Sequence, residues 1–202
     1  MNQGPAAESS EKPASRWHQF LLVGSLLPLC WLGMMLVHEL GHVVGAWLTG
    51  GTVAKVVLHP LAISRTDVWP NPQPLLVVAA GPVLGVLFPL IGWALARQAR
   101  LPGQYLLRFF AGFCLIANGA YLAFGALDGV GDAGDLLRNG AAIWQLWLFG
   151  GIAMPLGLYL WHGQGPHFGL GKAHGEVDPG AAWCCALLLA TIVAAELVFG
   201  GE

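Results

Sequence analysis

The chain has 202 residues, of which 56% are hydrophobic and 10% are charged, and its formal net charge is −2. This composition provides no basic surface for nucleic acid, so we expect no nucleic-acid partner. The high apolar content instead indicates a protein embedded in a membrane and in contact with lipid.

Residues 1–17 are rich in proline, serine, alanine and charge, which predicts a disordered N-terminal tail. Residues 18–202 are expected to form a single integral membrane domain. Five apolar runs within it are long enough to cross a hydrocarbon layer of roughly 30 Å. These runs cover residues 20–48, 75–96, 105–124, 141–161 and 181–199. The predicted fold is therefore an all-α polytopic membrane protein with about five transmembrane helices.

Two short β-branched segments separate the first and second apolar runs. Residues 52–58 and 61–66 flank His59-Pro60, which predicts a short β-hairpin or a re-entrant segment. The prolines within residues 69–74 favour extended geometry and mark the start of the second run. A further irregular segment, the glycine-rich residues 161–174, is expected to be a solvated loop.

The first apolar run contains the sequence His38-Glu39-Leu40-Gly41-His42. Histidines at i and i+4 project from one helix face and can hold one zinc ion, Zn²⁺. The glutamate after the first histidine can reach a zinc-bound water as general base. Charged residues cost about 2.5–3.5 kcal/mol each at the centre of a bilayer, so they are rare there without a partner or a task. We therefore predict a zinc site with His38 and His42 as ligands and Glu39 as the catalytic base.

A catalytic zinc normally has three protein ligands, so the two histidines require a third from elsewhere in the chain. Acidic residues are most concentrated directly after the third apolar run, where Asp128, Asp132 and Asp135 stand among glycines. We expect one of these carboxylates to fold back towards the first run. The alternative is a solvated or calcium-binding turn, although the spacing is not that of an EF-hand.

Together these motifs resemble the site-2 protease family of intramembrane zinc metalloproteases. The resemblance covers roughly residues 31–138 and rests on four segments: His38-Glu39-Leu40-Gly41-His42, Gly50-Gly51 with strand-like residues after it, Ala80-Gly81-Pro82, and Leu127-Asp128-Gly129 or Gly131-Asp132. It implies that two histidines and a distant aspartate bind zinc, while Glu39 activates water. Asp128 matches the family's literal Leu-Asp-Gly. The residues after Asp132 better match the pattern that follows the family's aspartate, so Asp132 is the predicted third ligand and Asp128 the alternative.

The chain also departs from the family's pattern. Gly85 stands where better-known members carry an asparagine, and Asn118 is not followed by proline. We expect Asn118, a polar residue within an apolar run, to donate an interhelical hydrogen bond. Gly81 and Gly85 are spaced to allow close helix approach.

The sequence therefore predicts a membrane zinc metalloprotease, a metalloendopeptidase in which Glu39-activated water attacks the scissile carbonyl. Its expected partners are membrane lipid and a transmembrane protein substrate, and its expected location is the plasma membrane. The hairpin and the loop at 161–174 are expected to gate the site. Two other functions stay open: a non-proteolytic membrane zinc hydrolase, and a metal-binding or transport membrane protein. The sequence leaves the oligomeric state unknown.

Overall fold

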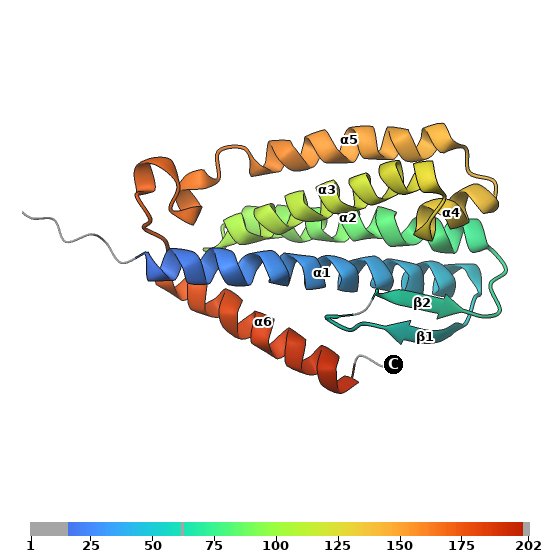
Figure 1. Ribbon diagram of the computed structural model, residues 1–202, viewed down its shortest axis with the longest axis horizontal. Helices are drawn as coiled ribbons and strands as arrows, with labels where there is room; N and C mark the ends of the chain where they lie inside the picture. The colour runs from blue at the N-terminus through green and yellow to red at the C-terminus, as the bar shows by residue number, and fades with distance from the viewer. Residues whose placement is uncertain (1–15, 62, 200–202) are drawn as a thin grey trace, which may run out of the picture.

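Helices make up most of the computed structural model, which describes residues 16–61 and 63–199 (Figure 1). The predicted tail at 1–17 lies almost entirely outside these residues. In chain order the elements are α1 (Trp17–Thr49), β1 (Val53–Val57), β2 (Arg65–Val68), α2 (Pro74–Gln98), α3 (Gln104–Asp128), α4 (Gly131–Arg138), α5 (Ile143–Trp161) and α6 (Pro179–Phe199), with short 3-10 turns at Gly165–Phe168 and Gly171–Ala173.

Five of these helices, α1, α2, α3, α5 and α6, are long and apolar enough to cross a membrane. This confirms the predicted all-α polytopic fold. Apolar side chains cover the outside as well as the inside of the bundle; on α2, for example, Leu87, Ile91 and Leu95 are exposed one turn apart. A helix that is apolar on all sides is typical of a membrane span, because its outer face contacts lipid.

The helices pack in a continuous series. α1 lies against α2 on one side and α6 on the other, while α3 packs against both α2 and α5 (Figure 1). Glycines bring α3 and α5 especially close. A Cβ added at Gly157 would lie 2.7 Å from the carbonyl oxygen of Gly112, and one added at Gly150 would lie 2.7 Å from the carbonyl oxygen of Gly119. Small residues at such contacts are typical of helix packing in membranes.

The predicted hairpin is present and lies beside the C-terminal part of α1 (Figure 1). α1 ends at Gly50 in a left-handed conformation, with a φ of 77°, and the Gly51 N–H donates to the Ala46 carbonyl at 2.8 Å. β1 and β2 pair antiparallel, with Val56 opposite Thr66. The second strand begins later than the predicted segment 61–66, because the turn extends to Leu61.

The aspartate-containing segment after α3 is not a loop, as its glycines suggested, but includes the eight-residue helix α4. α3 ends at Asp128, and Gly129 turns the chain with a φ of 64°. Ala133 and Leu136 of α4 are buried in a cluster with side chains of α3 and α5. This burial compensates for the cost of glycine in a helix, which is about 1 kcal/mol per residue.

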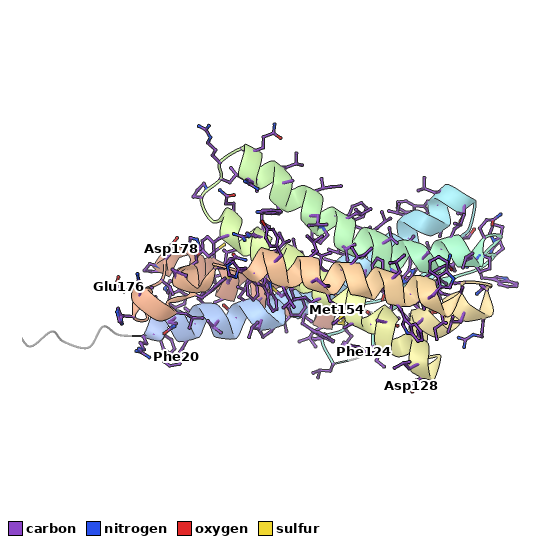
Figure 2. The ribbon with its side chains drawn as sticks, turned by 90° about the horizontal axis from the view of Figure 1, so that it is seen from above. Phe20, Phe124, Asp128, Met154, Glu176 and Asp178 are labelled. Atoms are coloured by element: carbon purple, nitrogen blue, oxygen red, sulfur yellow. The ribbon has the colours of Figure 1, made fainter. Side chains whose placement is uncertain are left out.

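The glycine-rich segment between α5 and α6 lies at the opposite end of the molecule from the hairpin (Figure 1). Gln19, near the start of α1, donates to the Phe168 carbonyl at 2.9 Å. At 1.5 Å per residue, Gln19 is about 28 Å from His38 along the helix. Glu176 and Asp178, which follow the segment, accordingly lie near Phe20 and far from Asp128 (Figure 2). The expectation that residues 161–174 gate the site was therefore wrong, because α5 carries the chain away from α4.

Candidate metal centre

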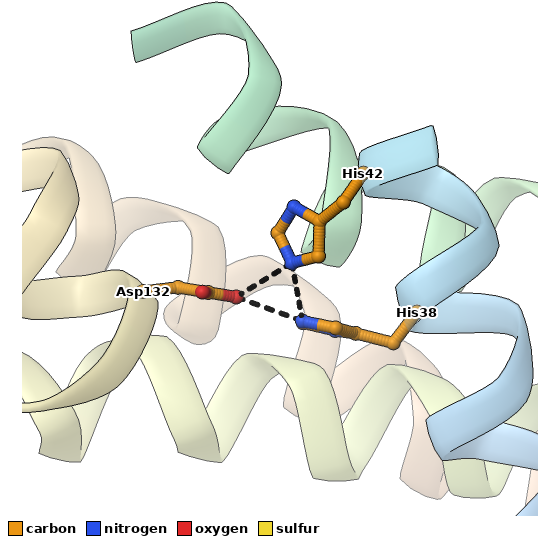
Figure 3. A group of neighbouring side chains, drawn as sticks. All are labelled: His38, His42 and Asp132. Carbon is orange, nitrogen blue, oxygen red and sulfur yellow. Dashed lines mark hydrogen bonds and ion pairs between the residues drawn. The ribbon is translucent and has the colours of Figure 1, made fainter. Parts of the chain in front are cut away.

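Three side chains from two helices meet at one point. His38 and His42 lie one turn apart on α1, and Asp132 lies in the first turn of α4 (Figure 3). The Nε2 of His38 is 2.7 Å from Asp132 Oδ2, and the Nε2 of His42 is 3.3 Å from the same oxygen. The two Nε2 atoms are 3.1 Å apart. Within residues 16–61 and 63–199 this is the one group of three or more His, Cys, Asp or Glu side chains that could hold a metal ion.

The other nitrogen of each imidazole faces an oxygen acceptor. His38 Nδ1 lies 2.7 Å from Asn118 Oδ1, and His42 Nδ1 lies 2.9 Å from the carbonyl oxygen of Val77. The amide of Asn118 is oriented by its own Nδ2, which donates to the Cys114 carbonyl at 2.9 Å. Both Nδ1 atoms therefore carry the hydrogen, which leaves a lone pair on each Nε2.

The three converging atoms are consequently all electron-pair donors. Without a proton between them, the two imidazole nitrogens and the carboxylate oxygen repel one another, and a bound cation removes this repulsion. A tetrahedral zinc with ligands at about 2.0–2.1 Å places those ligands about 3.3–3.4 Å apart. Two of the three separations, 3.1 and 3.3 Å, are close to this value, and the 2.7 Å between His38 Nε2 and Asp132 Oδ2 is shorter. The residues thus fit a zinc with three protein ligands and one open position.

Asp132 is held in place by its surroundings. Its backbone N–H donates to the Tyr121 hydroxyl at 3.1 Å, and the Tyr121 ring lies edge-on to His38. Burial raises the pKa of the Asp132 carboxyl, but an imidazolium at His38 or His42, protonated on Nε2, outweighs burial and lowers this pKa, and a metal cation in place of that proton acts in the same direction. Asp132 is therefore a carboxylate, the form that binds metal.

Glu39 is buried, with 4% of its surface exposed, and is not part of the ligand group. The Thr66 hydroxyl, from β2, donates to Glu39 Oε2 at 2.7 Å. The Glu39 carboxylate thus lies on the same helical turn as the two histidines but outside the ligand group. Its role in catalysis stays a prediction.

The backbone of α2 passes directly beside the two histidines. A Cβ added at Gly41 of α1 would lie 2.5 Å from the Ala80 carbonyl oxygen, and a Cβ added at Gly81 would overlap the His42 ring. Ala80-Gly81-Pro82 therefore makes room for the imidazole. The close approach expected for Gly81 occurs at the candidate metal centre.

The other two aspartates do not reach the site. Asp128 is the last residue of α3 and is exposed at the tip of the bundle (Figure 2). Asp135 lies one turn after Asp132 and pairs with Arg138 at 2.6 Å. Because α3 stays helical through Asp128 before the chain turns at Gly129, the alternative third ligand lies outside the group formed by His38, His42 and Asp132.

A family model described as Peptidase M50B-like matches residues 16–123. The chain belongs to this family. The match confirms the resemblance to the site-2 protease family and identifies an integral, multi-pass membrane protein of a metalloprotease family. It includes His38, Glu39 and His42 but ends within α3, so the assignment of Asp132 depends on geometry. No curated protein and no solved structure shows a significant match to the chain.

Proposed function

We propose that the protein is a zinc-dependent intramembrane endopeptidase that cleaves membrane-anchored proteins. The observation that carries this proposal is the convergence of His38 Nε2, His42 Nε2 and Asp132 Oδ2, with the buried Glu39 carboxylate on the same turn of α1. Membership of the M50B-like family supports a membrane metalloprotease that depends on zinc. The proposal adds the identity of the ion, the ligands and the kind of substrate.

The position of the histidines supports cleavage within the membrane. His42 precedes Thr49, the last residue of α1, by seven residues, or about 10 Å along the helix. Asp132 follows the end of α3, at the same end of the bundle as the hairpin (Figure 1). The site would then lie below one membrane surface, near enough for water to enter.

In the proposed reaction, His38, His42 and Asp132 hold the zinc. When bound, zinc would act as a Lewis acid that makes the catalytic water more acidic and polarises the scissile carbonyl. The Glu39 carboxylate takes a proton from the attacking water and passes it to the leaving amine. Asn118 and the Val77 carbonyl hold the Nδ1–H of each histidine, so that each Nε2 keeps its lone pair.

The hairpin supports a membrane-anchored protein as substrate. A two-stranded sheet has free strand edges, and an extended segment of a substrate can bind such an edge as an added strand. A substrate helix would have to unwind locally to present its peptide bond. The membrane we propose is the plasma membrane, and fractionation of cells tests that location.

The test is cleavage of a single-span peptide with a glycine-rich, helix-breaking segment, placed in lipid vesicles with the zinc-loaded protein. We expect wild type to cut this peptide and the Glu39→Gln variant to leave it intact. Mass spectrometry locates the cut and also analyses the vesicle lipids. Hydrolysed lipid beside an intact peptide would contradict the proposal and favour a non-proteolytic zinc hydrolase.

A further inference from the structure

The contact between Thr66 and Glu39 joins two elements that are far apart in sequence. The Thr66 hydroxyl lies 2.7 Å from Glu39 Oε2 and 3.4 Å from the Glu39 backbone oxygen. A hydroxyl has one hydrogen, and the shorter contact with the carboxylate identifies its acceptor. The donor therefore comes from β2, and the acceptor is the carboxylate next to His38 on α1.

The pairing of the hairpin explains why Thr66 faces α1. Side chains alternate between the two faces of a strand, and along β2 Arg65 and Asp67 are exposed whereas Thr66 and Val68 are partly buried. Val68 packs near Gly51, where an added Cβ would lie 3.1 Å from the Val68 Cγ1. Thr66 lies opposite Val56 in the ladder, so β1 fixes its position along the helix.

The contact leaves one oxygen of Glu39 for chemistry. Within residues 16–61 and 63–199, Oε1 accepts no hydrogen bond, and it is not among the fully buried atoms that lack a partner. A carboxylate with one oxygen anchored and the other accessible has a fixed orientation. Orientation matters for a general base, because it must lie within hydrogen-bond reach of the proton it takes.

We propose that Thr66 is a positioning residue for Glu39, so that the hairpin forms part of the catalytic site and not only an entrance to it. This inference rests on the proposed role of Glu39 as general base. The Thr66 hydroxyl fixes Oε2 and thereby aims Oε1. Since the hydroxyl belongs to β2, Glu39 is correctly oriented only while the hairpin is docked on α1.

The first part of the test measures turnover of the vesicle-bound, single-span peptide by four forms of the full-length, zinc-loaded protein. These are wild type, Thr66→Val, Thr66→Ser and the control Thr191→Val. Thr191 is a matched control, because its hydroxyl donates to the Leu187 carbonyl of its own helix, α6. Thr66→Ala replaces the valine variant if the latter fails to fold or to retain zinc.

A hydrogen bond to a charged group contributes enough to change a rate about 10- to 100-fold. We expect Thr66→Val to retain zinc and KM but to lose kcat by about that factor. Thr66→Ser, which restores the hydroxyl, should return close to wild type, as should Thr191→Val. A Thr66→Val variant with the kcat of Thr191→Val would overturn the proposal.

The second part does not depend on activity. Hydrogen–deuterium exchange across residues 53–68 is compared in wild type, Thr66→Val, Glu39→Ala and the double variant. If one contact holds the hairpin, each single change speeds exchange, and the double variant exchanges no faster than the faster single one. Additive effects would overturn the contact. If wild type and Glu39→Gln fail equally to cut the peptide, the proposed function fails, while the exchange result still decides whether Thr66 and Glu39 interact.

Discussion

Asn118 Oδ1 lies 2.7 Å from His38 Nδ1 across the interface between α3 and α1. The asparagine is 1% exposed, and its Nδ2 is occupied by the Cys114 carbonyl, so only its oxygen can face the histidine. This bond selects the imidazole tautomer whose Nε2 can bind metal. Asn118 thus forms the interhelical bond expected from the sequence, but as an acceptor.

Replacing Asn118 should weaken zinc binding, because partners that orient a ligating histidine typically contribute 10- to 100-fold to metal affinity. We expect Asn118→Ala to lower zinc affinity by about that factor, measured by competition with a chelator. The control is Asn139→Ala, because Asn139 is exposed and its side chain donates to the Asp135 carbonyl, away from the ligand group. Equal affinity in the two variants would show that the contact does not orient His38.

Gly81→Ala should displace the His42 ring, because the added methyl group would overlap it. Forcing an extra carbon into a packed site costs about 1–3 kcal/mol, and here His42 must move. We expect zinc affinity to fall at least tenfold. Gly92→Ala is the matched control on the same helix, since no atom of residues 16–61 or 63–199 lies within 4 Å of the added carbon. If Gly81→Ala binds zinc as Gly92→Ala does, then α2 does not hold His42 as described.

The three aspartates should differ sharply in their effect on zinc. Asp132→Ala removes a ligand and should lose both zinc and activity. Asp128→Ala and Asp135→Ala change residues that lie outside the ligand group, so both should retain zinc. Metal analysis of the three purified variants checks this. Loss of zinc from Asp128→Ala with retention in Asp132→Ala would reverse the assignment.

Glu39→Gln should separate binding from chemistry. Glutamine keeps the size and one acceptor oxygen of glutamate, so fold and zinc content should be unchanged. It cannot take a proton, so turnover of the single-span peptide should fall by about 10² or more. Undiminished cleavage by this variant would exclude Glu39 as general base. A variant that loses zinc would instead indicate that Glu39 is a ligand.

The histidine pair could be predicted because its signal is local. Spacing of four residues within one apolar run places His38 and His42 on one face of a helix, whatever the rest of the chain does. Asp132 was one of a few candidate acidic residues, and only the family resemblance favoured it over Asp128. In the structure, Asp132 reaches the histidines because it lies on α4. The glycines at 129, 131 and 134 argued against a helix there, but the burial of Ala133 and Leu136 stabilises it.

The residues that support the candidate site were harder to predict from the sequence than the histidine pair. Asn118 was visible as a polar residue within a span. Thr66 and Tyr121 were not, because nothing in the sequence fixes the register of the hairpin or the rotation of α3 against α1. The carbonyl of Val77 is a backbone group, which any residue supplies, and the role of Gly81 follows only from how closely α2 crosses α1.

The most direct test of the account is the zinc content of the purified protein after zinc loading and removal of excess metal. We expect about one zinc per chain in the wild type and none in the His38→Ala, His42→Ala double variant, because the double variant retains a single ligand. Circular dichroism establishes that both proteins are helical. Full zinc occupancy in the double variant, or a folded wild type that binds no zinc, would contradict the metal centre at His38, His42 and Asp132.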